Sequence, residues 1–157
     1  MVGIVVELVE TVTEDAIGLI TALEIELGGT YAAEQRHGLK IEEIFRPNVR
    51  FFIARLDGVA AGCGAIGLYD GYAELKRMFV RPDMRGRGVI QAVLARLEAE
   101  ATARGYSRIT LETGDVLHAA HKIYERAGYR RCAAFGNYVG MGPNQIGRSV
   151  FMDKRVG

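Results

Sequence analysis

The sequence is poor in the residues that cross-link or stiffen a chain: 157 residues include two cysteines, three prolines and no tryptophan. The two cysteines, Cys63 and Cys132, provide neither a disulfide framework nor the paired spacing of a zinc site. We therefore expect no metal and a reducing, cytoplasmic location.

Long apolar runs and charge of one sign are also missing. No run approaches the roughly 18 apolar residues of a membrane span, and the start, MVGIVVELVETV, lacks the basic residues and cleavage site of a signal peptide. The 20 Lys and Arg residues nearly balance 19 Asp and Glu residues, for a net charge of +1. Bulk charge therefore argues against nucleic acid and membrane surfaces as partners.

What is present fits a globular protein. Hydrophobic residues make up 49% and charged residues 25% of the chain, and the length suits a single domain over 1–157 with one core. Glycine is abundant, at 20 residues. The places of these glycines matter for function.

The first part of the chain predicts a strand and a helix. Residues 2–10 are β-branched and partly alternating, which is typical of a strand. Thr13, or Thr11 with Glu14 as a capping box, precedes a helix that ends at Gly28-Gly29. Its buried side recurs at spacings of three and four and consists of Ala16, Ile20, Leu23 and Leu27.

A three-stranded meander follows. Two Asp-Gly pairs separate the apolar runs 49–56, 59–69 and 72–80, and Asp-Gly between apolar runs is a strong hairpin signal. We also expect a short helix over 39–45, ended by Pro47.

The second half alternates helices and strands. A helix from Val89 to Gly105 precedes a strand at 107–112, which is expected to be parallel to the strand before that helix. The remaining predicted elements are a helix over 116–127 with Ala120, Ile123 and Ala127 inward, strands at 129–135 and 148–154, and a glycine-rich loop at 136–147. The predicted fold class is α+β, with helices on both faces of a mixed, mostly antiparallel sheet.

A basic, glycine-rich turn between a strand and a helix is the sharpest feature. It reads FVRPDMRGRGV over residues 79–89. The free N–H groups and dipole at a helix start form an anion site, and Gly86 and Gly88 would let the anion approach the backbone. Arg85 and Arg87 can add charge-assisted hydrogen bonds, so the turn suits a pyrophosphate.

The turn resembles the motif R/Q-x-x-G-x-G/A of the GCN5-related N-acetyltransferase (GNAT) superfamily. This sequence departs from the motif only at its last position, Ile90. A later run, IYERAGY over residues 123–129, is similar to the family's L-Y-E-x-x-G-F/Y. The resemblance implies a splayed pair of parallel strands that holds acetyl-CoA as co-substrate. The implied cofactor-binding residues are Met78, Phe79, Val80, Arg85, Gly86, Arg87, Gly88, Val89, Ile90 and Gln91.

The same resemblance implies direct attack of a primary amine on the thioester. The matching positions for the general base are Glu74, eleven residues before Arg85, and Glu112, twelve residues before Tyr124. We prefer Glu74, although it could instead pair with Lys76 or Arg77. Tyr124 matches the acid that protonates the leaving thiolate, and a backbone amide within 78–80 matches the oxyanion donor.

The acceptor stays open between a small-molecule and a peptide amine, and a homodimer is possible. The family places acceptor specificity in regions that correspond to 28–47 and 136–147. Glutamates including Glu24 and Glu26 favour a cationic acceptor there, unless they are solvated surface residues. Ile90 departs from the family motif, and Leu117 stands where many members have an asparagine, seven residues before the tyrosine. Because of these two departures, the alternative function is a non-catalytic acyl-CoA-binding regulatory module.

Overall fold

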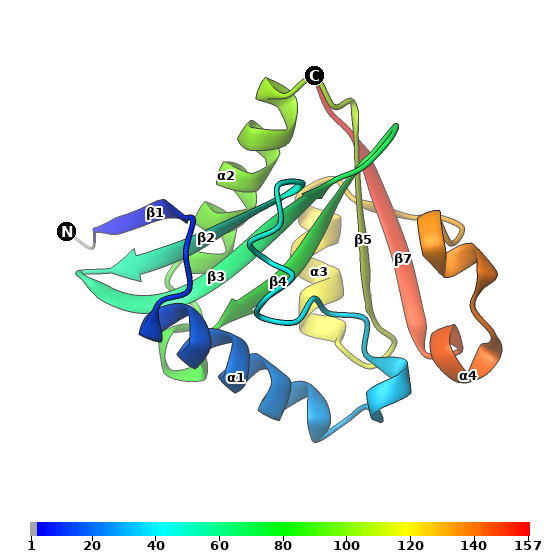
Figure 1. The fold of residues 1–157 in the computed structure, drawn as a ribbon, viewed down its shortest axis with the longest axis horizontal. Helices are drawn as coiled ribbons and strands as arrows, with labels where there is room; N and C mark the ends of the chain where they lie inside the picture. Colours follow the sequence, from blue (N-terminus) through cyan, green and yellow to red (C-terminus); the bar gives the residue numbers. More distant parts are fainter. Residues whose placement is uncertain (1–2) are drawn as a thin grey trace.

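A seven-stranded sheet organises the chain, in the order β1-β2-β3-β4-β5-β7-β6. The computed structural model describes residues 3–157, and Figure 1 shows the helices and the sheet. The strands are β1 (Ile4–Val9), β2 (Val49–Leu56), β3 (Val59–Leu68), β4 (Ala73–Val80), β5 (Arg108–Gly114), β6 (Arg130–Arg131) and β7 (Ser149–Arg155). The helices are α1 (Glu14–Gly28), α2 (Val89–Ala103), α3 (His118–Arg126) and α4 (Pro143–Ile146).

The predicted meander is confirmed. Strands β2, β3 and β4 are consecutive antiparallel neighbours. At the first hairpin, Asp57 and Gly58 have φ angles of 49° and 86°, as a two-residue turn with both central residues left-handed requires.

The sheet carries a hydrophobic core on each face. Neighbouring residues of β2 point to opposite sides, so Phe51 packs in the core under α1 and Phe52 in the core under α2. Helix α1 begins as predicted, with the Thr13 Oγ1 accepting a hydrogen bond from the Ala16 N–H at 3.1 Å. The sheet is therefore covered on both faces, as the sequence predicted (Figure 1).

One pair of strands is parallel, and it splays. Strand β4 pairs with β5 from Ala73–Ile109 to Leu75–Leu111 only, although β4 continues to Val80 and β5 to Gly114. Helix α2 makes the crossover between them, as a parallel connection requires. The predicted parallel pair and its splay are confirmed, and the gap places functional groups of both strands opposite one another.

The predicted helix over 39–45 is wrong. This segment forms turns, in which the N–H groups of Glu43 and Ile44 donate to the Lys40 carbonyl. The Leu39 carbonyl accepts the Arg77 Nε–H at 2.8 Å instead of an amide of a following turn. A side chain from β4 thus takes the acceptor that would have started a short, intrinsically marginal helix.

Three other expectations need correction. The strand expected over 129–135 is limited to β6, and the loop expected over 136–147 contains a 3₁₀ turn at 136–140 and the short helix α4. The fully buried residues of α3 are His121 and Tyr124, whereas the predicted inward residues Ala120, Ile123 and Ala127 are half-buried, with both alanines packed against the core under α2. His121 is inward because its Nε2 bonds the Gly114 carbonyl at 2.7 Å.

Within residues 3–157, no helix is both long and apolar enough to span a membrane.

Candidate active site

A cleft of about 990 Å³ opens where β4 and β5 stop pairing. Its walls come from the end of α1, the loop 30–38, strand β4, the turn before α2, the segment from β5 into α3, and Tyr138. Glu74, Glu112 and Tyr124 all line it, and so do Met78, Phe79, Val80, Arg85, Gly86, Gly88, Val89, Ile90 and Gln91. Arg87 is exposed and lies outside this lining.

Backbone amides dominate one end of the cleft. Gly86 and Gly88 take left-handed φ angles of 78° and 85°, and α2 begins directly after Gly88. The first amide with an acceptor at this helix start is that of Ala92, which donates to the Gly88 carbonyl at 3.1 Å. In the described chain no side chain caps this end, and the first turn of α2 has no acidic residue. Unpaired amides and a positive dipole end meet the requirements of a phosphate site.

The two arginines of the turn differ in their contacts. Arg85 donates through Nε to the Val80 carbonyl at 2.9 Å and pairs with Glu26 at 2.7 Å. Arg87 has no ion-pair partner among residues 3–157 and is exposed. Arg85 thus holds the turn together, whereas Arg87 is available to an anion. The Ile90 side chain packs partly against the core of α2 while it lines the cleft.

A bulge in β4 lies beside the cleft. The register with β3 jumps from Phe79 to Lys76, so that Arg77 and Met78 together face Gly64. Arg77 takes a left-handed φ of 54° to achieve this. A bulge disrupts the regular hydrogen-bond ladder, and here the Arg77 carbonyl accepts from the Cys63 thiol of β3 at 3.3 Å. Of the three predicted oxyanion positions, only Met78 is in the bulge.

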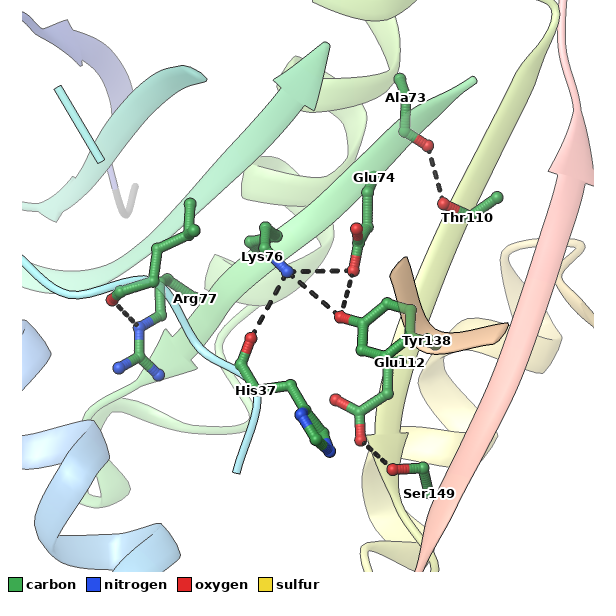
Figure 2. Close-up of polar contacts among 10 residues, drawn as sticks. His37, Ala73, Glu74, Lys76, Arg77, Thr110, Glu112, Tyr138 and Ser149 are labelled. Atoms are coloured by element: carbon green, nitrogen blue, oxygen red, sulfur yellow. Dashed lines mark hydrogen bonds and ion pairs between the residues drawn. The ribbon is translucent and has the colours of Figure 1, made fainter. Parts of the chain in front are cut away.

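The carboxylate of Glu74 belongs to a buried network. Its Oε2 accepts from the Lys76 Nζ at 3.0 Å and from the Tyr138 hydroxyl at 2.7 Å. Lys76 also donates to the Tyr138 oxygen and to the His37 carbonyl, at 3.2 and 3.4 Å (Figure 2). Glu74 and Lys76 therefore form the pair considered from the sequence, but as a buried pair rather than at the surface.

Glu112 faces the same space from β5 with different bonding. Its Oε2 accepts from the Ser149 hydroxyl of β7 at 2.6 Å. Burial raises the pKa of Glu112 above its usual range, the Glu74 carboxylate adds to this, and Ser149, His37 and Lys76 act against it. A carboxylate with a raised pKa is a stronger base than an ordinary one.

Tyr124 is held by packing. Its ring meets that of Tyr129 edge to face, with centroids 6.0 Å apart. Burial and the Glu112 carboxylate both raise the pKa of the Tyr124 phenol, which keeps it protonated at neutral pH. Within the described chain its hydroxyl makes no hydrogen bond, so the donor is free to serve a group in the cleft.

The sequence missed several polar residues of the site. Tyr138 comes from a loop 64 residues after Glu74, and Ser149 from the strand beyond Glu112. No short sequence motif links residues this far apart. The contact between Lys76 and Glu74 could be predicted, because residues two apart in a strand share a face.

The predicted acceptor regions meet at the cleft. His37 donates through Nε2 to the Gln145 carbonyl at 2.7 Å, and its ring lies edge to face with Tyr138 at a centroid distance of 5.4 Å. Residues 3–157 contain no group of three or more His, Cys, Asp or Glu that could hold a metal ion. His121 of α3 is buried and bonded to the backbone.

A splayed parallel pair, an uncapped helix start and buried carboxyl groups in one cleft form an arrangement that suits an acyltransferase. The profile of the Acetyltransferase (GNAT) family matches residues 19–129. This chain belongs to the GNAT family of acetyltransferases.

Individual relatives support this assignment. The chain is 39% identical over 148 residues to the IAA acetyltransferase of Azospirillum brasilense, covering 92% of this chain and 94% of that protein. Among solved structures, a candidate acyl-CoA N-acyltransferase of Klebsiella pneumoniae superimposes with a TM-score of 0.78 at 31% identity, covering 98% of both chains. The PaiA N-acetyltransferase of Thermoplasma acidophilum, solved with coenzyme A, has the same fold, with a TM-score of 0.68 at 17% identity and coverage of 97% and 99%.

Proposed function

We propose that this protein is an acetyl-CoA-dependent N-acetyltransferase that acts on a primary amine. The observation that carries the proposal is that an uncapped helix start and a buried carboxyl group with a raised pKa line one cleft. The first suits the pyrophosphate of the coenzyme and the second suits proton removal from an alkylammonium.

The turn before α2 would hold the coenzyme. The amides of residues 86–91 have no acceptor in the described chain and point to a phosphate ligand rather than to a side-chain cap. Arg87 would add charge from the exposed side of the turn. Acetyl-CoA supplies the acetyl group as a thioester, whose carbonyl carbon the neutral amine attacks as the C–N bond forms and the C–S bond breaks.

We propose Glu112, in preference to Glu74, as the general base. An effective base needs at least one oxygen that is not engaged in another bond, and within residues 3–157 both carboxylates accept hydrogen bonds through Oε2 only. The Glu74 Oε2, however, is already engaged by the Lys76 ammonium group as well as by the Tyr138 phenol. Among the described residues Glu112 has no ion-pair partner, and its raised pKa makes it the better acceptor for the proton of the ammonium group.

Two other groups complete the proposed chemistry. The amide at Met78, in the bulge of β4, would donate to the thioester oxygen as negative charge develops on it. The Tyr124 hydroxyl would donate to the departing sulfur and give it a proton. Glu112 would take the first proton from the ammonium group and later release it to water. The nitrogen loses a second proton as the amide forms, and that proton would restore the Tyr124 phenol, so the thiol gains one proton and one proton leaves the cleft in each turnover.

The proposal is tested by following thiol release from acetyl-CoA with a panel of primary amines, together with calorimetry of CoA binding. We expect binding of CoA and turnover with at least one class of amine. Binding without turnover on any amine would favour the regulatory module instead, and the absence of both would contradict the proposal.

The partners and the location of the protein stay predictions. An amine of small-molecule or peptide type is supported by the family assignment. The possible homodimer and the cytoplasmic location are tested by sedimentation of the purified chain and by fractionation of the cells that express it.

A further inference from the structure

Tyr31, just after α1, bridges two segments that border the cleft. Its hydroxyl donates to the Asp115 Oδ1 and accepts from the Val116 N–H, both at 3.1 Å. Asp115 and Val116 belong to the connection from β5 to α3, which lies beside the segment after α1 (Figure 1). The Tyr31 side chain therefore ties the loop 30–38 to the connection 115–117.

Arg148, the residue before β7, reinforces this contact. Its Nη2 pairs with the Asp115 Oδ1 at 3.1 Å, and its Nη1 donates to the Thr30 carbonyl at 3.2 Å. The guanidinium carbon of Arg148 lies 4.5 Å from the centre of the Tyr31 ring, as in a cation–π contact. We call Tyr31, Asp115 and Arg148 the clamp, because together they join three segments that are far apart in the sequence.

The last residue of β5 leaves room for the clamp. An added Cβ at Gly114 would overlap the ring and hydroxyl of Tyr31, so a larger residue there would displace the tyrosine. The Gly114 carbonyl accepts from the Leu117 N–H at 3.3 Å and from the His121 Nε2 at 2.7 Å. Tyr31 thus packs on the residue that anchors the start of α3.

The two segments joined by Tyr31 are opposite walls of one cleft. Thr30 and Tyr31 line it from the loop 30–38, and residues 116–120 line it from the segment that leads along α3 to Tyr124. A coenzyme that reaches from the turn before α2 to Tyr124 would lie along this second wall and order it. When one side of a bonded contact is already ordered, ordering the other side costs less conformational entropy.

From these contacts we propose that Tyr31 is a positioning residue: coenzyme bound along 116–120 fixes the loop 30–38 through the Tyr31 hydroxyl. The inference rests on the proposed N-acetyltransferase function. The loop carries His37, whose ring lies beside the Glu112 side chain in Figure 2, so the acceptor end is completed as the coenzyme binds. Because such coupling is reciprocal, coenzyme and amine would each raise the affinity for the other by the same factor.

Hydrogen exchange with CoA as the probe tests the coupling on the full chain. The amides of Gln35 and Arg36 are bonded within the loop, and we expect CoA to slow their exchange by about 5- to 10-fold, the lower end of the usual coupling between sites. Tyr31→Phe keeps the ring beside Arg148 and removes the hydroxyl. It should abolish most of this slowing, while the amides of 86–91 still respond to CoA.

Kinetics provide a second readout, with the best amine of the panel. Tyr31→Phe should raise KM for the amine by about 5- to 10-fold and change kcat by less than about twofold, because the proposed base Glu112 and the proposed acid Tyr124 are unchanged. A purely structural loss would lower the amount of folded enzyme, and with it kcat, without this shift in KM.

The matched control is Tyr106→Phe, which removes a hydroxyl bond to the Tyr69 carbonyl outside the cleft. Gly114→Ala, which displaces Tyr31 but keeps its hydroxyl, should behave as Tyr31→Phe does. Slowing of the loop that persists in both clamp variants, or equal effects in Tyr31→Phe and Tyr106→Phe, would overturn the inference and leave the acetyltransferase function intact. If CoA slows exchange neither at 86–91 nor in the loop, the proposed function and the coupling both fail.

Discussion

The two ends of the cleft differ in whether backbone groups or side chains form them. At the coenzyme end, the turn before α2 offers backbone amides, and its side chains mostly shape or flank them. At the acceptor end, side chains from β4, β5, β7 and two loops bond one another around Glu74 and Glu112. A site made of backbone depends on local geometry, whereas a network of side chains depends on residues far apart in the sequence.

The largest effect that we expect is a difference in kcat between variants of the two carboxylates at the acceptor end. Glu112→Gln should lower kcat by about 10²- to 10⁴-fold, the usual contribution of a general base, and should leave CoA affinity unchanged. Glu74→Gln should cost less catalytically, because we assign Glu74 to the Lys76 pair. Steady-state thiol release and calorimetry check both variants.

Glu125→Gln, on the exposed side of α3, is the control for this comparison. A larger catalytic loss in Glu74→Gln than in Glu112→Gln would reverse the assignment of the base and restore the preference drawn from the sequence.

At the coenzyme end, the next effect concerns Arg87. Arg87→Glu should weaken CoA binding by about 10- to 100-fold, since it replaces an exposed cation beside the proposed phosphate site with an anion. The effect should shrink at high salt because the residue is exposed. Calorimetric titration at two ionic strengths measures it.

Arg131→Glu, on the exposed strand β6, makes the same charge change away from the cleft and should leave the CoA affinity nearly unaltered. Equal losses in the two variants would mean that Arg87 acts through overall charge only.

A third prediction sharpens the role of Ser149. Its hydroxyl stabilises the charged form of Glu112, so Ser149→Ala should raise the pKa of this carboxyl further. Because the base must be ionised, the acidic limb of the kcat/KM profile should then move to higher pH. A pH series of thiol release with Ser149→Thr, which keeps the hydroxyl, is the control.

If Ser149 served packing alone, Ser149→Ala would lower the profile at every pH without moving its limb. That result would separate Ser149 from the proposed base.

The contrast between the ends explains what the sequence could predict. The turn at 86–88 was predictable because glycine, a preceding strand and a following helical period are adjacent in the chain, and the structure gives both glycines left-handed φ angles. The hairpins were predictable for the same reason.

Long-range contacts explain what the sequence could not predict. The segment 39–45 failed as a helix because Arg77, 38 residues from Leu39, takes its first acceptor. In the network of Glu74, the pair with Lys76 was open to prediction from the strand spacing, but the bond from Tyr138 was not, since Tyr138 follows 64 residues later.

The smallest expected effect tests whether the network around Glu74 is structural. Tyr138→Phe removes a phenol that donates to a buried carboxylate, and should lower the free energy of unfolding by about 2 kcal/mol, within the range for bonds to charged groups. Tyr106→Phe removes a bond to a neutral carbonyl and should cost about 1 kcal/mol. Urea unfolding compares the two. The kcat of Tyr138→Phe should be nearly normal, because Lys76 still holds Glu74. A large loss of kcat with unchanged stability would instead show that the network takes part in proton transfer. In that case both Glu74 and Glu112, rather than Glu112 alone, would act in catalysis.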